Sequence, residues 1–474
     1  QGFASSYEGN SWYRLIGSTP SGWKPVTSDQ FVAVERYLAI NPVDGYGYKI
    51  KQEALPTISV PVHVPEILLP DTVYILEGLE GDIYFDNLMG EYARKYDIDV
   101  SGNAGLHQNN RLNFPIGSSS GLNPTTIKVI NNDDGEVLAS ATTIVNISPA
   151  SNRTGENINT VVIGDSLVNA GIMTQTLLDN ASTDVMDITL HGTRGSAPNL
   201  HEGRGGWRVP DYTTIGRTNY QFDVTGVVVE PNINSTTYSY GGSVFKVQEV
   251  DLVGGDGTLL CDLESGPVPT GSGALVKVFG VGDDNVTFTS VAPVSQNPFW
   301  IGGQIDFGQY QVDNSIPTLE VVLIALGIND VFGQSTDAGA INKATDYAGQ
   351  LEILVSSIRA ANPSCRIGIV LPTPPADQDA FGFNYGTGQY AARNKRNIFI
   401  WNQVFNDQYG SREGSLVFVV PSYVSMDSVN NYPTVTQDVN SRNTTQVIRQ
   451  SNSVHPATSG YQQIGDSWFA FIKS

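Results

Sequence analysis

The chain has 474 residues, and its 47 acidic and 26 basic side chains give a formal net charge of −21 at pH 7. A chain of this length is expected to form two or three cores. The strong negative charge without a basic patch argues against nucleic acid and anionic lipid surfaces as partners. A hydrophobic content of 40% with only 15% charged residues excludes a disordered acidic protein.

The first 150 residues have the pattern of β structure. Apolar and polar residues alternate over 57–67, and two strand-like runs flank an Asp-Gly turn within 126–138. Pro61 and Pro65 confine the first of these strands to an edge or a bulge, because proline cannot donate a hydrogen bond within a sheet. We therefore expect an N-terminal all-β domain over residues 1–150, most simply a sandwich.

From about residue 158 the pattern changes to short apolar runs that alternate with helical stretches. Runs of this kind are typical of strands buried on both faces of a sheet. They predict an open, mostly parallel α/β sheet whose ligand site lies at the carboxyl ends of its strands. The predicted strands lie at 160–164, 187–192, 321–327, 366–372 and 416–421, and the predicted helices near 168–180, 338–361, 388–407 and 458–473.

One segment interrupts this alternation. Residues 213–304 contain β-type runs, such as 222–230 and 274–280, with turn-rich sequence between them. We expect a β subdomain over 213–304, inserted into an α/β domain that comprises 158–212 and 305–474.

Four short motifs carry side chains with catalytic potential. Ser166 follows the run that ends at Gly164, in Gly-Asp-Ser-Leu, where a serine at a strand-to-helix junction is exposed at the edge of the sheet. His455 lies in Ser-Val-His-Pro before the last predicted helix. A hydroxyl needs a neighbouring base to become a nucleophile, and an imidazole has a suitable pKa for that role. The other two motifs are Gly203-Arg-Gly-Gly-Trp and Gly327-Ile-Asn-Asp.

Together and in this order, these motifs resemble the SGNH (GDSL) hydrolase superfamily, in particular its carbohydrate-esterase-like members. The resemblance covers about 158–212 and 305–474 and implies a flavodoxin-like α/β/α sandwich. It implies that Ser166 is the nucleophile, that His455 is the general base, and that Gly206 and Asn329 supply oxyanion contacts beside the Ser166 N–H. Gly205 and Gly203 remain alternatives to Gly206.

The chain departs from the family at one position. The acid that usually lies three residues before the histidine is replaced by Asn452. An amide can orient an imidazole but cannot supply the charge that stabilises imidazolium. The site is therefore either a Ser–His dyad, with Asn452 or a backbone carbonyl orienting the ring, or it takes a carboxylate from elsewhere, with Asp427 and then Asp438 as the nearest upstream candidates.

Other residues near the motifs suggest further roles. Glu202 and Trp207 border the glycine loop and are candidates for substrate contact, and Asp165 and Asp330 are expected to brace the loops. The sequence has no His-Glu-x-x-His motif and no aspartate-rich calcium loop, so neither a metal nor another cofactor is expected.

These observations predict a serine esterase that removes O-acyl groups, in particular O-acetyl groups, from a polysaccharide or oligosaccharide through an acyl-enzyme. Two alternatives remain: a lipase or aryl esterase, and a glycan-binding or virion tail adhesion module with a vestigial hydrolase fold. The acidic, lysine-poor composition suits an extracellular protein, either secreted or on a virion or cell surface. No apolar run approaches the roughly 18 residues of a membrane helix, so no membrane insertion is expected.

Overall fold

The structure is a computed structural model that describes residues 64–474 except positions 217, 234 and 379, together with five short strands among the first 63 residues. The chain divides into two compact units, Gln1–Val64 and Pro65–Ser474. In the first unit, β1, β2 and β3 form one antiparallel sheet and β4 pairs with β5. These strands are β1 (Ser5–Glu8), β2 (Ser11–Leu15), β3 (Trp23–Val26), β4 (Leu38–Ile40) and β5 (Gly47–Lys49). The strand predicted at 57–67 falls mostly outside the described residues.

The second unit begins with two small β sheets. One has the strand order β6-β12-β11-β8 and the other β7-β10-β9. Along β11 the inward-facing Thr125, Ile127 and Val129 are fully buried and alternate with partly exposed residues, as a half-buried strand requires. The strands are β6 (Thr72–Leu76), β7 (Gly81–Tyr84), β8 (Asp97–Gly102), β9 (Leu106–His107), β10 (Arg111–Phe114), β11 (Gly121–Ile130) and β12 (Val137–Ser148), with 3₁₀ turns at Phe85–Leu88 and Ala93–Lys95.

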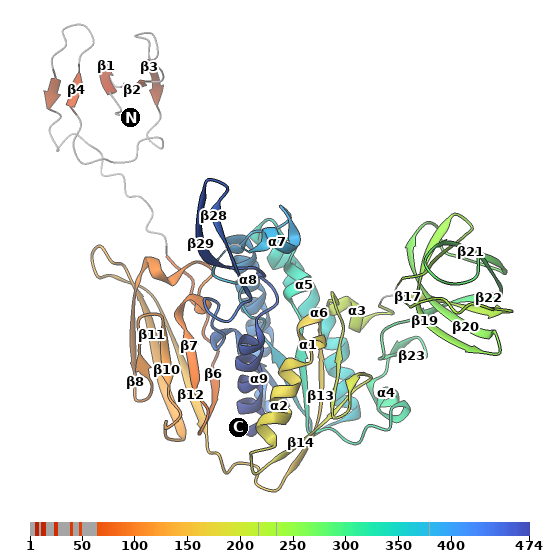
Figure 1. Cartoon of the computed structure of the whole chain (residues 1–474). Helices are drawn as coiled ribbons and strands as arrows, with labels where there is room; N and C mark the ends of the chain where they lie inside the picture. Colours follow the sequence, from red (N-terminus) through yellow and green to blue (C-terminus); the bar gives the residue numbers. More distant parts are fainter. Residues whose placement is uncertain are drawn as a thin grey trace. The chain divides into compact units, whose positions relative to one another are not determined.

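A mostly parallel sheet forms the centre of the mixed α/β fold (Figure 1). Its five principal strands have the order β14-β13-β25-β26-β27, and all these pairs are parallel. β16 also runs parallel to the end of β13 and pairs with the antiparallel β15. The bounds are β13 (Asn157–Gly164), β14 (Asp187–His191), β15 (Arg194–Ser196), β16 (Asn199–Gly203), β25 (Val321–Ala325), β26 (Arg366–Val370) and β27 (Val417–Val420).

Two pairs of helices cover this sheet: α2 packs beside α9, and α6 packs beside α8. The chain moves from β13 to β14 in one direction and from β13 to β25 and β26 in the other. Right-handed crossovers therefore place α2 and α6 on opposite faces. The helices are α1 (Ser166–Asn169), α2 (Ile172–Ala181), α3 (Val209–Thr213), α4 (Phe307–Asp313), α5 (Ile328–Val331), α6 (Asp337–Ala361), α7 (Phe381–Tyr385), α8 (Ala391–Tyr409) and α9 (Thr458–Lys473), with 3₁₀ turns at Glu413–Ser415 and Ser422–Val424.

Residues 218–295 form a closed six-stranded barrel with its own buried core. Its strand order is β17-β20-β19-β18-β21-β22, and the pairs between neighbouring strands are antiparallel. The strands are β17 (Thr218–Thr225), β18 (Thr237–Tyr240), β19 (Ser243–Val253), β20 (Asp256–Ser265), β21 (Gly273–Phe279) and β22 (Asn285–Ser295). Two short hairpins lie outside the barrel: β23 (Trp300–Ile301) with β24 (Gln304–Ile305), and β28 (Thr434–Asn440) with β29 (Asn443–Gln450).

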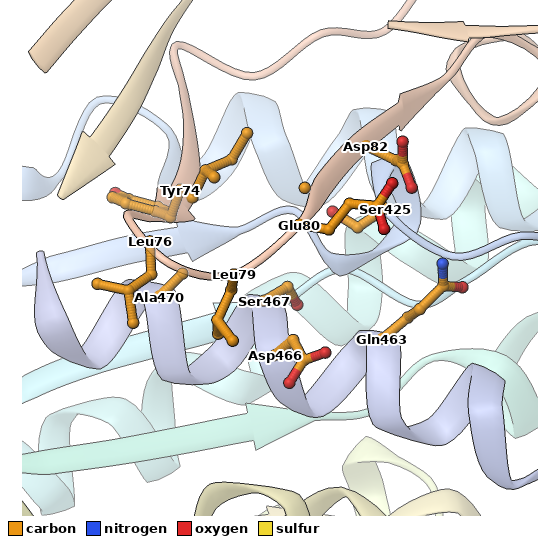
Figure 2. A pocket seen from close by; sticks show the side chains of 12 residues that line it. Tyr74, Leu76, Leu79, Glu80, Asp82, Ser425, Gln463, Asp466, Ser467 and Ala470 are labelled. Atoms are coloured by element: carbon orange, nitrogen blue, oxygen red, sulfur yellow. The ribbon is translucent and has the colours of Figure 1, made fainter. Parts of the chain in front are cut away.

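The strands of 72–148 share one continuous hydrophobic core with the α/β sheet and its helices. Tyr74 on β6 makes an edge-to-face contact with Phe471 on α9, with ring centroids 5.2 Å apart. Beside this contact, a small groove of about 30 Å³ with both polar and apolar lining lies between the β6–β7 connection and α9 (Figure 2). Its lining includes Glu80, Asp82 and Asp466 but neither Ser166 nor His455. The groove is thus a feature of the contact between these strands and α9.

Candidate active site

The junction between β13 and α1 places Ser166 at the carboxyl edge of the sheet. Asp165 is the N-cap of α1, and its Oδ1 accepts a hydrogen bond from the Leu167 N–H at 2.9 Å. A Cβ atom on Gly164 would lie 2.3 Å from Val168 Cγ2 and 2.7 Å from the Ala325 oxygen. Only glycine allows this close approach of helix and strand. The sequence therefore produces a tight turn that leaves Ser166 partly exposed as the first residue of α1.

His455 faces the serine from the loop between β29 and α9. Its Nε2 atom lies 2.9 Å from Ser166 Oγ, although 289 positions separate the two residues in sequence. Burial lowers the pKa of the His455 imidazole below its usual range, which favours the neutral ring. A neutral imidazole at this distance can accept the serine proton, so the pair has the geometry of a nucleophile and its general base.

The two groups expected to orient His455 do not hydrogen-bond to its ring. The Asn452 amide oxygen instead accepts hydrogen bonds from the backbone N–H groups of Val454 and His455, both at 2.9 Å. The Asp427 carboxylate accepts backbone N–H groups from Val429 and Asn430, which fixes its own loop. Within the part of the chain that the structure describes, no carboxylate hydrogen-bonds to the ring, so this geometry is a dyad with a braced backbone.

Asp427 and Asp438, the upstream alternatives, have other partners. Besides the two N–H groups, the Asp427 carboxylate accepts hydrogen bonds from the Tyr84 hydroxyl and the Asn430 side chain. Asp438 lies on the β28–β29 hairpin and accepts a hydrogen bond from the Gln446 side chain. The expected orienting role of Asp427 is therefore not seen: its acceptor oxygens are occupied by groups of its own loop and by the Tyr84 hydroxyl.

The two residues expected to bind an oxyanion lie on neighbouring loops. Gly206 follows β16 and has a φ of 71°, a left-handed conformation that favours glycine. Asn329 is the second residue of α5, directly after β25, and its Nδ2 donates to the Trp207 carbonyl at 3.1 Å. Next to it, Asp330 Oδ1 accepts the Val209 N–H at 2.9 Å. These two side chains of α5 hold the loop 206–209 in place. The third expected donor, the Ser166 N–H, lies in the first turn of α1 and has no partner within that helix.

Two buried carboxyl groups flank the site. Asp165 and Asp330 are 2% and 5% exposed. Burial is the main reason that the pKa of each carboxyl is raised from 3.8 to about 7, and the charge of Asp165 contributes to the raised pKa of Asp330. Asp330 Oδ2 is buried and has no hydrogen-bond partner among the described residues. As expected from the sequence, both acids brace loop backbones, through Leu167 and Val209.

The prediction that Glu202 and Trp207 contact substrate is wrong, because both side chains are buried. Glu202 has no exposed surface and accepts hydrogen bonds from the Thr193 N–H at 2.6 Å and the Tyr310 hydroxyl at 2.7 Å, and it forms an ion pair with Arg204. Trp207 is 3% exposed and packs against Tyr212, with ring centroids 4.6 Å apart. Glu202 lies at the end of a buried strand, where an acidic side chain needs internal partners.

One structural residue of the site has no recognisable signal in the sequence. Tyr212 is fully buried, and its hydroxyl donates to the carbonyls of Gly164 and Glu202. The Arg204 N–H also donates to the Gly164 carbonyl, at 3.0 Å. The end of β13, which positions the serine, is thereby connected to the start of the glycine loop. A tyrosine eight residues after Arg204 has no spacing that would identify this role.

An apolar cavity of about 30 Å³ lies at the same edge of the sheet. Its lining includes Asp165 and Leu167, which flank Ser166, and residues that follow β25 and β26.

Among the described residues, no group of three or more His, Cys, Asp or Glu side chains is arranged to hold a metal ion. No helix in the described part of the chain is long and apolar enough to cross a bilayer.

Comparison with known proteins gives only distant structural likeness. No family model and no curated protein matches the sequence. A possible lipase from Chitinophaga pinensis is 11% identical, with a TM-score of 0.32, and the match covers 66% of this chain and 97% of that chain. A family 3 carbohydrate esterase from Talaromyces cellulolyticus is 12% identical, with a TM-score of 0.29, and the match covers 66% and 96%. A family two carbohydrate esterase from Clostridium thermocellum, solved with cellohexaose, is 11% identical, with a TM-score of 0.29, and the match covers 84% and 93%.

Proposed function

We propose that the protein is a serine esterase that removes O-acyl groups, specifically O-acetyl groups, from carbohydrate. The observation that carries this proposal is the 2.9 Å separation between Ser166 Oγ and His455 Nε2 at the carboxyl edge of the sheet. Two further features support it: the loop that contains Gly206 is fastened to the helix that contains Asn329, and the strand order around β13 is the flavodoxin-like 2-1-3-4-5 order expected of an SGNH hydrolase.

The proposed reaction has two stages. Ser166 Oγ attacks the ester carbonyl while His455 Nε2 accepts the hydroxyl proton. The negative charge on the carbonyl oxygen is stabilised by the Ser166 and Gly206 N–H groups and by Asn329 Nδ2. His455 then returns the proton to the departing sugar hydroxyl, which leaves an acyl-Ser166. A water molecule then attacks the acyl carbonyl while His455 Nε2 accepts its proton, and the bond to Ser166 Oγ breaks as His455 returns that proton to Oγ, which releases the acid and regenerates the serine.

The dyad performs this cycle without a carboxylate on the imidazole. In a complete triad the third residue holds the ring and stabilises imidazolium. Here Asn452 fixes the backbone of the histidine loop, so positioning is supplied but charge stabilisation is not. The lowered pKa of His455 agrees with this arrangement, because no carboxylate raises it.

The choice of a carbohydrate ester rests on the sequence. The form Glu202-Gly-x-Gly-Gly-Trp of the second motif resembles carbohydrate-esterase members more than lipases, and no long apolar segment could serve as a lipase lid. We include in the proposal an extracellular setting and an SGNH unit at 158–212 and 305–474, to which the β segments at 1–150 and 213–304 are added.

Acetate release tests the proposal directly. Wild type and Ser166→Ala would be incubated with acetylated xylan, acetylated pectin and an acetylated capsular polysaccharide. We expect release by wild type and none above background by the variant. Equal release by both would refute the nucleophile assignment. Activity confined to long-chain or aryl esters in a chain-length series would favour a lipase or aryl esterase, and absence of activity on every ester would favour the binding module.

A further inference from the structure

An aromatic cluster lies between the two loops that contain the catalytic side chains. Phe332 directly follows α5, three residues after Asn329. Its ring packs against Tyr385 and Phe381 of α7, with centroid separations of 4.9 and 5.9 Å. We call Phe332, Phe381 and Tyr385 the aromatic shelf. One side of the shelf is therefore continuous in sequence with the proposed oxyanion donor.

The other side of the shelf is hydrogen-bonded to the loop that contains His455. The Ala380 N–H donates to Ser453 Oγ at 3.0 Å, and Asn384 Nδ2 donates to the Ser451 carbonyl at 2.9 Å. Gln378 and Gln450 exchange two hydrogen bonds of 2.7 and 3.0 Å between side chain and backbone. α7 accordingly lies beside the base of the β28–β29 hairpin, from which the chain continues to His455 (Figure 1). The shelf thus bridges the Asn329 loop and the His455 loop.

The shelf also has an accessible aromatic surface. Phe381 is buried, whereas Phe332 and Tyr385 are only partly buried. The Tyr385 hydroxyl makes no hydrogen bond with any described residue, and it is not among the fully buried polar atoms of this part of the chain. A half-exposed aromatic ring with an unused hydroxyl suits a ligand that has both an apolar face and polar edges.

The charge of this segment narrows the ligand class. Residues 380–392 contain no Asp, Glu, Lys, Arg or His, although the whole chain has a charge of −21. A site for a uronate or another anionic sugar would need a cationic partner, and this segment supplies none. The neutral aromatic and amide composition instead fits a neutral pyranose, whose C–H face packs on a ring while its hydroxyls form hydrogen bonds.

We propose that Tyr385, supported by Phe332, is a subsite for a neutral sugar unit of the substrate. This inference rests on the proposed function, because it takes the Ser166–His455 site as the place where the ester binds.

Binding measurements test the shelf independently of hydrolysis. In a Ser166→Ala background, xylohexaose, cellohexaose and mannohexaose would be titrated by calorimetry. Tyr385→Leu, which keeps apolar bulk against Phe332 but removes the ring, is expected to weaken binding of the preferred hexaose about tenfold, while Tyr385→Phe stays within about threefold. Phe279→Ala is the matched control, because Phe279 is 70% exposed on the barrel strand β21. It is expected to leave hexaose binding unchanged in this background and ester hydrolysis unchanged when introduced into the wild type.

The outcomes separate this inference from the proposed function. Equal affinity of the Tyr385→Leu and Tyr385→Phe variants would overturn the shelf, as would failure of all three hexaoses to bind at millimolar concentration. Melting curves of both variants exclude loss of fold as the cause of weaker binding. Ethyl acetate contains no sugar, so its hydrolysis by the wild type tests the catalytic dyad alone. If binding depends on Tyr385 but the protein has no esterase activity, the sugar subsite at Tyr385 is supported and the proposed esterase function is refuted.

Discussion

Asn452 and His455 are joined by a hydrogen bond of 2.9 Å from the His455 backbone N–H to the Asn452 side-chain oxygen. In the SGNH hydrolases that the four motifs resemble, an acid that serves the imidazole usually occupies the position of Asn452. Here the side chain stabilises the turn that presents the imidazole, and the ring has Ser166 as its partner at Nε2. In the described part of the chain, the His455 ring therefore has no carboxylate to stabilise its charged form, and this affects how the reaction rate depends on pH.

The pH–rate profile of the wild type is the first prediction. Burial lowers the pKa of His455 from 6.5, so the ring stays neutral at a lower pH than an exposed histidine would. Because only the neutral ring accepts a proton, kcat/KM falls as pH decreases through this lowered pKa. We expect the acidic limb of kcat/KM for an aryl acetate to have its midpoint below pH 6.5. A midpoint clearly above 6.5 would mean that a carboxylate serves the ring.

Asn452→Asp tests the missing charge. The aspartate keeps an oxygen for the Val454 and His455 N–H groups and adds a negative charge three residues before the imidazole. A nearby anion favours imidazolium, so the acidic limb is expected to move to higher pH. Because the added charge would also stabilise imidazolium in the transition state, kcat is expected to rise at pH values above the pKa of the His455 ring. Asn452→Ala, which removes the acceptor, should lower kcat without this shift in the profile. An unchanged profile in Asn452→Asp would show that position 452 does not reach the ring.

Asn329→Ala tests the oxyanion contact. Loss of one well-aimed donor typically costs about 10²–10³ in kcat, or about 3 kcal/mol, with little effect on KM. The same side chain also donates to the Trp207 carbonyl, so the melting temperature must be measured alongside the kinetics. A fall in kcat with unchanged melting supports the assignment. A kcat within threefold of wild type would remove Asn329 from the oxyanion site.

The sequence predicted the elements that depend on regular patterns. The buried runs at 160–164 and 321–327 correspond to β13 and β25, because parallel strands covered on both faces need uninterrupted apolar residues. Ser166 and His455 could be paired because their motifs belong to a recognisable set, although 289 positions separate them. The β28–β29 hairpin was not predicted, because its strands are mostly exposed and lack apolar alternation.

The errors concern which way a side chain faces. Glu202 and Trp207 border the glycine loop in sequence, but β16 directs Glu202 inward and Trp207 packs against Tyr212 of α3. The partners that satisfy Glu202, including Thr193 and Tyr310, come from segments whose proximity depends on the tertiary fold. The role of Tyr212 in connecting β13 to the glycine loop likewise depends on contacts across the sheet edge.

Glu202→Ala is expected to act on stability. It would leave Arg204, which is 7% exposed, as a buried charge without its carboxylate partner. Breaking a buried pair on one side typically costs about 3–5 kcal/mol. Urea unfolding should show a loss of this order, and Glu202→Gln, which keeps acceptors for Thr193 and Tyr310, should lose less. A variant with normal stability but a raised KM would restore the substrate-contact role that the structure contradicts.

Asp330→Asn separates the charge of this acid from its hydrogen bond. The pKa of Asp330 is raised to about 7 in the folded state from 3.8, so the folded protein holds this proton over a range where the unfolded chain releases it. Its contribution to stability is fully present below about pH 3.8 and is lost as pH rises through 7. Asparagine is neutral at every pH and keeps an oxygen for the Val209 N–H. The variant should therefore gain stability relative to wild type between pH 5 and pH 8, measured as the free energy of unfolding in urea.

Asp330→Ala is the matched control for the hydrogen bond. It also removes the charge, but it leaves the Val209 N–H without its acceptor. This loss is expected to lower the free energy of unfolding by about 1–3 kcal/mol at pH 5 and at pH 8 alike. Because Val209 follows the loop that contains Gly206, loosening this contact should also lower kcat for an acetyl ester, whereas Asp330→Asn should largely preserve it. If Asn and Ala variants lost kcat equally, the carboxylate charge would matter for the loop, and the bracing role assigned to the oxygen would be wrong. If neither variant changed the pH dependence of unfolding, Asp330 would be ionised in the folded protein throughout this range.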